Sequence, residues 1–223
     1  MIKATQITKS FDGRQILKGI DLEVADGEFL SIMGESGSGK STFLSILAGN
    51  LRADSGSVLL DGEDLSSMNE KKLAKLRRTK LGFVYQSLNL IPTLNVKDNI
   101  LLPLYLDRAS LRKGRERMEE MAELLRVSHL MNAFPKDMSG GECQRVAIAR
   151  AMVHEPSVLM LDEPTGSLDT HATADVMELL CRLNRECGVT VIQVTHSRQT
   201  SLYGDRTVFI SDGLVSLDAP ATL

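Results

Sequence analysis

A short stretch that begins at residue 34 combines glycines with a lysine and a serine in the order G-x-x-x-x-G-K-S. The glycines let the backbone turn so that successive N–H groups point inward and cradle phosphate oxygens. The lysine adds a positive charge near the outer phosphates, and the serine offers a hydroxyl to Mg²⁺. The pattern predicts a site for a nucleoside triphosphate rather than an ordinary glycine-rich turn. With the threonine that follows, its residues are Gly34, Glu35, Ser36, Gly37, Ser38, Gly39, Lys40, Ser41 and Thr42.

The segments on either side of this loop predict a strand before it and a helix after it. Residues 29–33 form a short apolar run, and residues 42–48 have helical spacing and stop at Gly49, a good C-cap. A helix that starts at the loop adds partial positive charge where the phosphates would lie. This strand–loop–helix setting is the one that phosphate binding requires.

A second motif, Ser139-Gly140-Gly141-Glu142, stands before an apolar-patterned helix. Ser139 and Glu142 have the S-x-x-E spacing of a capping box, which alone would mark only the start of a helix. Two adjacent glycines inside the box are unfavourable for helix formation. They make sense if an anion, such as a γ-phosphate, must approach the backbone at that helix N-terminus.

The run from Met138 to Ala151, M-S-G-G-E-C-Q-R-V-A-I-A-R-A, resembles the signature motif of ATP-binding-cassette (ABC) ATPases. In that family the motif contacts the nucleotide that the opposite subunit holds. The resemblance covers essentially the whole chain. Met138 stands where the family usually has Leu, and Cys143 stands where this branch usually has Gln. Neither departure removes Ser139 or the glycines.

The resemblance assigns further roles to polar residues that follow apolar strands. Asp162 and Glu163 end the run that starts at Ser157, where ligand-binding residues of parallel sheets lie. Asp162 would hold Mg²⁺, and Glu163 would act as the general base for the attacking water. His196, after the strand-like run 189–195, resembles the switch histidine that contacts the γ-phosphate. The alternative for the carboxylates is a solvated turn.

Three more residues match family positions, each with an ordinary alternative. Gln86 resembles the Q-loop glutamine, a ligand to Mg²⁺ that senses the membrane partner, and could instead be a surface glutamine. Phe11 resembles the aromatic residue that stacks on adenine, and could instead pack in the core. Asp169 resembles the D-loop aspartate at the dimer interface, and could also cap the following helix.

Composition is that of an ordinary globular protein. The chain has 223 residues, of which 43% are hydrophobic and 25% charged. Its 26 Lys and Arg against 29 Asp and Glu give a net charge of −3, which argues against a nucleic-acid partner. We see no signal peptide and no apolar run near the ~18 residues that span a bilayer. Three cysteines without metal spacing fit a reducing cytosol.

We expect an α/β fold: a P-loop NTPase (RecA-like) core with an antiparallel β layer and an inserted helical subdomain. Residues 1–223 would form a single ABC ATPase domain. Within it, residues 1–86 would hold the β layer and the P-loop half of the core. Residues 87–155 would be the helical subdomain with the signature motif, and residues 156–223 the second half of the core.

The stretch 87–103 is apolar and broken by prolines, which makes it difficult to interpret as core. In the family this region forms the groove that receives the coupling helix of the membrane subunit. Together with Phe134-Pro135 before the signature, it resembles the branch of macrolide exporters, lipoprotein-release systems and bacitracin-resistance systems. The cell-division ATPase that works with a membrane subunit is a near relative.

Two basic runs remain. The first holds Lys71, Lys72, Lys75, Arg77, Arg78 and Lys80 on a predicted helix, and the second holds Arg108, Arg112, Lys113, Arg115 and Arg117. Charge runs are usually solvated faces. The alternative is that they lie near anionic lipid at the inner face of the membrane.

The resemblance implies an ATP-hydrolysing subunit that forms a homodimer around two ATP molecules and drives an integral membrane permease. The alternative is a regulatory ABC ATPase of the cell-division type, which moves no substrate. Lys40, Ser41, Gln86 and Asp162 would hold ATP and Mg²⁺. We expect the protein to be peripheral, at the cytoplasmic face of the inner or plasma membrane.

Cys143 falls in the first turn of the helix that begins at Ser139. The helix dipole there favours a thiolate, although Glu142 opposes it. We expect Cys143 to be the most reactive of the three thiols.

Overall fold

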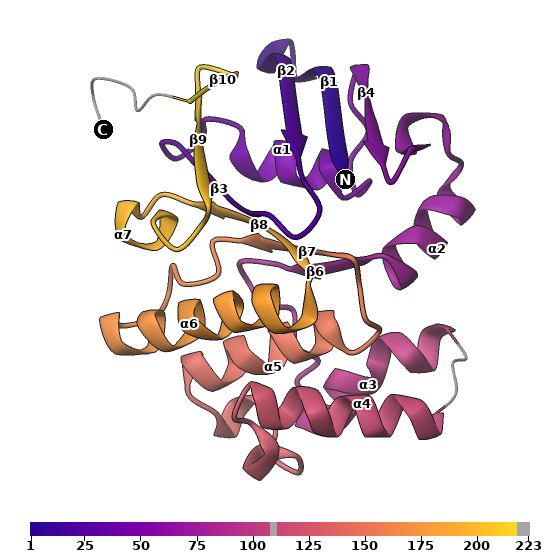
Figure 1. The fold of residues 1–223 in the computed structure, drawn as a ribbon, viewed down its shortest axis with the longest axis vertical. Helices are drawn as coiled ribbons and strands as arrows, with labels where there is room; N and C mark the ends of the chain where they lie inside the picture. The colour runs from indigo at the N-terminus through magenta and orange to yellow at the C-terminus, as the bar shows by residue number, and fades with distance from the viewer. Residues whose placement is uncertain (108–110, 218–223) are drawn as a thin grey trace.

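The computed structural model describes residues 1–107 and 111–217, which form two sheets with helices around them (Figure 1). The central sheet has the strand order β10-β9-β3-β8-β7-β6. All neighbours in it are parallel except β10, which is antiparallel to β9. Its strands are β3 (Phe29–Met33), β6 (Leu81–Val84), β7 (Val158–Asp162), β8 (Thr190–Thr195), β9 (Arg206–Ser211) and β10 (Leu214–Ser216).

The second sheet is antiparallel and lies above the central sheet in Figure 1. Its order is β2-β1-β4-β5, from β1 (Ile2–Phe11), β2 (Arg14–Val24), β4 (Ser55–Leu60) and β5 (Glu63–Asp64). Strand β2 buries alternate residues, so that the apolar face packs inward. This is the predicted antiparallel β layer.

Helices lie on both sides of the central sheet. On one side, between the two sheets, is α1 (Lys40–Leu47), and on the other are α5 (Gly140–Met152) and α6 (Thr170–Cys187) (Figure 1). Farther from the sheet on that side lie α3 (Val96–Asp107) and α4 (Leu111–Leu124). The remaining helices are α2 (Glu70–Thr79), the one-turn α7 (Arg198–Ser201) and the 3₁₀ turns Leu65–Ser67, Ser128–Leu130 and Pro135–Asp137.

Two hydrophobic clusters hold the layers together, one on each face of the central sheet. One packs the β layer and α1 against the sheet, and the other packs α3 to α6 against it. Met118, Met121 and Leu125 of the stretch 87–155 are buried, whereas Leu124 is only partly buried. The division of the chain at residues 86 and 155 stays a prediction. Strand β6 of the first stretch pairs with β7 of the third stretch in the central sheet.

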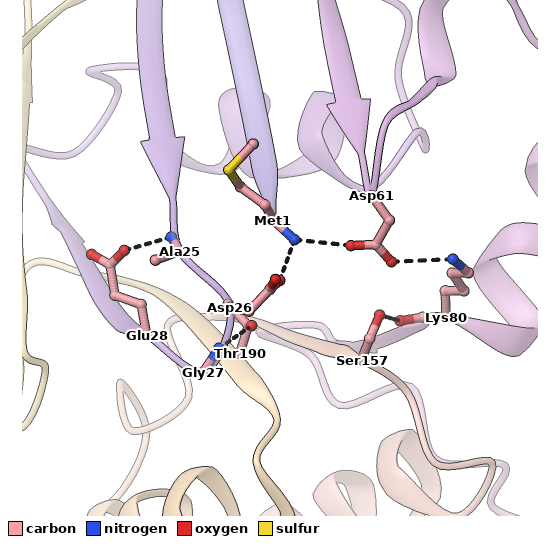
Figure 2. A network of polar contacts seen from close by, with 9 residues as sticks. All are labelled: Met1, Ala25, Asp26, Gly27, Glu28, Asp61, Lys80, Ser157 and Thr190. Carbon is pink, nitrogen blue, oxygen red and sulfur yellow. Dashed lines mark hydrogen bonds and ion pairs between the residues drawn. The ribbon is translucent and has the colours of Figure 1, made fainter.

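Polar contacts join the β layer to the amino ends of β6 and β8 in the central sheet (Figure 2). The Lys80 Nζ donates to Asp61 at 3.1 Å, and the Gly27 N–H donates to the Thr190 hydroxyl at 2.9 Å. The amino group of Met1 lies between Asp61 and Asp26 and contacts both. These links tie the start of β1 and the segments after β2 and β4 to the central sheet.

Candidate nucleotide site

The carboxyl ends of three neighbouring strands bring the predicted site residues to one edge of the central sheet. Parallel pairing places Met33 of β3 opposite Thr195 of β8, and Asp162 of β7 opposite Val194. The loop at 34–39, Glu163 and His196 come directly after these strands. The sheet thus assembles residues that are far apart in the sequence, at the edge where open α/β sheets bind ligands.

The P-loop needs glycine at its first position. Gly34 has φ +156°, and a Cβ there would lie 2.2 Å from the Ile210 carbonyl oxygen. Lys40 is the first residue of α1 and is 6% exposed. Its Nζ donates to the carbonyl oxygens of Gly34 and Glu35, each at 2.8 Å. The start of the loop therefore folds around the ammonium group of Lys40.

Burial lowers the pKa of Lys40, while the nearby carboxylates of Glu163 and Asp162 oppose that shift. A buried ammonium group near the start of α1 is poorly solvated. It therefore gains from an anion, and the helix N-terminus beside it favours the same charge. The electrostatics of the loop suit a phosphate.

Ser41 and Asp162, both predicted metal ligands, lie in contact. The Ser41 hydroxyl donates to Asp162 Oδ1 at 2.7 Å. Burial raises the pKa of Asp162, and the hydrogen bond from Ser41 works against that shift. A carboxylate and a hydroxyl oxygen are the ligand types that Mg²⁺ takes, and a cation would compensate the cost of burying the charge. The residues present therefore fit a magnesium ion held jointly with phosphate oxygens.

Glu163 and His196 form the second close pair. Nδ1 of His196 lies 3.0 Å from Oε2 of Glu163, whose side chain is 11% exposed against 64% for the histidine. Glu163 has φ +49°, an uncommon backbone conformation for a residue other than glycine. Its N–H donates to the Val194 carbonyl oxygen at 3.0 Å, which holds this conformation. Backbone strain of this kind concentrates at functional sites.

Hydroxyl groups that the sequence did not predict form hydrogen bonds on both sides of His196. The Thr195 hydroxyl accepts from the Ser197 N–H and bonds the Thr200 hydroxyl, both at 3.0 Å. Ser197 in turn caps α7 by accepting from the Thr200 N–H at 3.3 Å. A serine at position 197 with Thr200 three residues later is a helix-capping signal. This signal could have predicted these hydrogen bonds from the sequence.

The signature motif begins α5 as a capping box. The Ser139 hydroxyl accepts from the Glu142 N–H at 3.3 Å, and the Glu142 carboxylate accepts from the Ser139 N–H at 2.7 Å. Asp169 caps the neighbouring α6 by accepting from the Ala172 N–H at 2.8 Å. Gly140 faces Leu168 and Gly141 faces Ala172, so the motif and the D-loop segment pack together. Among the described residues, no hydrogen bond or ion pair joins Ser139 to the P-loop.

Gln86 and Phe11 lie apart from these contacts. Gln86 is exposed beyond the end of β6 and makes no hydrogen bond with any described residue. Phe11 is 44% exposed, which excludes the alternative that it packs in the core. The Lys9 Nζ lies 5.4 Å from the centre of its ring. Both side chains are accessible to a ligand.

The expectation for Cys143 was wrong. Its thiol is half-buried, and Sγ contacts the Pro135 carbonyl oxygen at 3.6 Å. Burial raises the pKa of Cys143, and the Glu142 carboxylate raises it further. Desolvation therefore outweighs the helix dipole.

Comparison with known proteins defines the class. The family model for the ABC transporter matches residues 17–166. The bacitracin export ATP-binding protein BceA of Halalkalibacterium halodurans is 40% identical over 219 residues, which cover 96% of this chain and 87% of that protein. The lipoprotein-releasing system ATP-binding protein LolD of Bacteroides thetaiotaomicron is 41% identical, with coverage of 98% and 100%.

A solved structure agrees with the fold. The dimeric post-hydrolysis structure of the ATP-binding cassette MJ0796, bound to ADP and Pi, superposes with a TM-score of 0.89 at 38% identity, covering 97% of each chain. The chain belongs to the ABC transporter family. It is an ATP-binding and ATP-hydrolysing subunit of an ABC transport system, and its relatives confirm the predicted branch. No helix in residues 1–107 or 111–217 is long and apolar enough to cross a membrane.

Proposed function

We propose that two copies of this chain close over two ATP molecules and that each composite site takes residues from both copies. The observation that supports this proposal is that the signature motif lies apart from the other site residues of the same chain. Lys40, Glu163 and His196 gather at the edge of the sheet, whereas Ser139 caps a different helix and does not contact them. The dimeric structure of the MJ0796 cassette supports this arrangement.

In this proposal Ser41 and Asp162, with Gln86, would hold a magnesium ion, which would neutralise charge on the phosphates. Lys40 and the loop N–H groups bind the phosphate oxygens. Glu163 accepts the proton of the attacking water, and His196, fixed by its bond to Glu163, contacts the terminal phosphate. Phe11 stacks on the base, and Ser139, Gly140, Gly141 and Asp169 of the second copy complete the site.

Mixing two inactive variants tests shared sites. Lys40→Ala breaks the P-loop, and Ser139→Arg places a large cation where the partner's γ-phosphate would lie. Dimers of either variant alone have two broken sites, but a mixed dimer has one complete site. We expect hydrolysis to return when the two proteins are combined. A mixture that shows only the sum of the separate rates would refute shared sites.

We further propose that a permease helix docks in a groove between α2, β6 and α3. This hollow has a volume of about 370 Å³ and is lined mainly by apolar side chains, including Phe83, Tyr85, Leu102, Pro103 and Leu106. Leu106 is 67% exposed and Tyr85 41%. Such a groove suits the apolar face of an amphipathic helix. Leu90, within the predicted segment, instead packs against the core.

Charge reversal tests the groove. Leu106→Glu would put a carboxylate where the permease helix removes water, which is costly. We expect this variant to keep its basal ATPase rate and to lose co-purification with the co-expressed permease subunit. Leu217→Glu, at a side chain that is 68% exposed and outside the groove, is the matched control. Docking at the cytoplasmic face of the membrane would follow from this contact.

A further inference from the structure

The described parts of the two basic runs meet on one side of the molecule; Arg108 of the second run lies outside the described residues. Helix α2 lies at the right of Figure 1, and the start of α4 lies below it on the same side. Arg78 of α2 donates to Asp107, at the end of α3, at 3.1 Å. Arg78 and Lys113 of α4 line one depression of about 260 Å³. Residues 35 positions apart thus contribute to one surface.

Helix α2 has one apolar side and one cationic side. Leu73 and Leu76 are buried, whereas Lys71, Lys72 and Lys75 are exposed. These three lysines form no ion pair with any described residue. We define the cationic face as Lys71, Lys72, Lys75, Arg78 and Lys113.

The acidic groups beside this face are largely engaged. Glu70 pairs with Arg77, and Asp107 pairs with Arg78. Asp61 and Glu63 pair with Lys80, and Figure 2 shows the contact with Asp61. Exposed Glu116 of α4 forms no ion pair with a described residue and offsets one of the five cations. The face therefore carries a net positive charge, although the chain as a whole carries −3.

A second depression of about 410 Å³ lies on the same helix. Lys72, Lys75 and Lys80 line it with Thr79, Glu63, Met68 and Leu76. Lys80 is paired with Asp61 and Glu63, and the Thr79 hydroxyl donates to the Lys75 carbonyl oxygen. The ammonium groups of Lys72 and Lys75 form no ion pair with described residues and are donors suited to phosphate oxygens. The surface thus combines a positive charge with a depression that can bind phosphate groups.

The cationic face continues the rim of the permease groove. Arg77 and Arg78 of α2 line that groove, and Arg78 also lines the depression that holds Lys113. The docked helix belongs to a protein in the bilayer, so the rim of its groove faces the leaflet. The cytoplasmic leaflet carries anionic lipid and attracts basic segments within about a Debye length.

From this juxtaposition we propose that the cationic face binds anionic phospholipid headgroups beside the permease. The proposal rests on the proposed function for the orientation of the groove, but the contact itself needs no permease. Nucleic acid is the other polyanion to consider. Arg78 belongs both to this face and to the lining of the permease groove, and that position beside a membrane partner favours lipid.

Vesicle flotation tests the proposal with the full chain and no permease. Wild-type protein is mixed with vesicles of phosphatidylcholine and phosphatidylglycerol, or of phosphatidylcholine alone. We expect partition only into the anionic vesicles, and a loss of partition as salt is raised. The double variant Lys72→Gln/Lys75→Gln should bind on the order of tenfold more weakly.

The matched control is Arg126→Gln/Lys136→Gln. Both side chains are exposed and form no ion pair with described residues. Arg126 follows the end of α4, a helix of 14 residues and therefore about 20 Å long, and Lys136 lies in the 3₁₀ turn Pro135–Asp137. Both double variants should keep the unfolding midpoint of the wild type, because all four side chains are exposed. The control should float like the wild type.

Three outcomes would overturn the proposal: no partition of the wild type, equal losses in the two double variants, or equal binding to neutral vesicles. Tighter binding to a short duplex DNA than to anionic vesicles would assign the face to nucleic acid instead. The mixing experiment with Lys40→Ala and Ser139→Arg contains no vesicles. A failure of lipid binding is therefore distinct from a failure of the composite site.

Discussion

His196 Nδ1 lies 3.0 Å from Glu163 Oε2, which joins the residue after β8 to the residue after β7. The carboxylate is almost buried and the imidazole is mostly exposed, so the carboxylate anchors the ring. With Nδ1 engaged, Nε2 of His196 is without a partner among the described residues and is available to a ligand. One contact thus orients both a base and a ring toward the same edge of the sheet.

Removal of the base should separate ATP binding from hydrolysis. Glu163→Gln keeps the shape of the side chain and its contact with His196, but an amide cannot accept the proton of the attacking water. We expect hydrolysis to fall by ~10²–10⁴-fold with ATP binding retained. Closed dimers should therefore accumulate with ATP and Mg²⁺, as measured by size-exclusion chromatography.

Glu155→Gln is the control for this change. Glu155 also has a positive φ, of +55°, and is exposed outside the site. That variant should hydrolyse ATP at the wild-type rate and elute like the wild type. A Glu163→Gln protein that stays monomeric with ATP at high concentration would count against the sandwich dimer.

A methyl group at Gly34 should disrupt the P-loop. In Gly34→Ala the new Cβ meets the backbone oxygen of Ile210 at 2.2 Å, and a backbone group cannot rotate away as a side chain can. In Gly27→Ala the φ of +73° also disfavours alanine, but no atom lies within 4 Å of the Cβ. Gly27→Ala should therefore cost only the backbone strain, roughly 1 kcal/mol.

Equilibrium ATP binding and denaturant unfolding check this pair of variants. We expect Gly34→Ala to lose both ATP affinity and more stability than the control. Equal losses in the two variants would mean that β9 moves aside and that the close approach is not required.

The sequence pointed to the residues that the structure gathers at one edge of the sheet because these residues form local patterns or end a strand. The P-loop, the capping box and the carboxylates at the end of β7 each have a short-range pattern with a physical cause. The Glu163–His196 contact required the order of strands, since β7 and β8 are separated by α6. The resemblance to the family supplied that order.

The burial of the Cys143 thiol could not be predicted from the sequence. The Cys143 thiol faces Pro135 in the packed turn before α5, and no local pattern shows this contact. The cationic face depends on α2 and α4 lying on one side, which is a tertiary arrangement. The basic runs alone did not show whether each run forms its own solvated face or whether the two runs contribute to one surface.

His154 should make the protein less stable in mild acid. Its Nε2 bonds the Leu81 carbonyl oxygen at 3.0 Å, and its buried Nδ1 has no partner. Burial lowers the pKa of His154 below its usual value of 6.5. Below about that pH the unfolded chain binds more protons than the folded chain, so the free energy of unfolding falls as the pH falls.

His154→Gln keeps a donor for Leu81 and removes the titrating group. The variant should lose less stability than the wild type between about pH 7 and pH 5 in urea unfolding. His171→Gln is the control, because His171 is 90% exposed. Parallel curves for the wild type and the His154 variant would show that other groups cause the acid sensitivity.

The exposed Cys187 should be the thiol that reacts first. Thiolate, not thiol, attacks a maleimide, and burial raises the pKa of both Cys143 and Cys181. Cys187 ends α6 in the open, whereas the other two are half-buried and hydrogen-bonded to carbonyl oxygens. Peptide mapping by mass spectrometry after brief labelling should find the adduct on Cys187.

A Cys187→Ser protein should label slowly and keep its ATPase rate, because residue 187 lies at the opposite end of α6 from Asp169. Urea should expose Cys143 and Cys181 and equalise the rates. Rapid labelling of Cys143 in the folded Cys187→Ser protein would instead show that the turn before the signature helix opens readily.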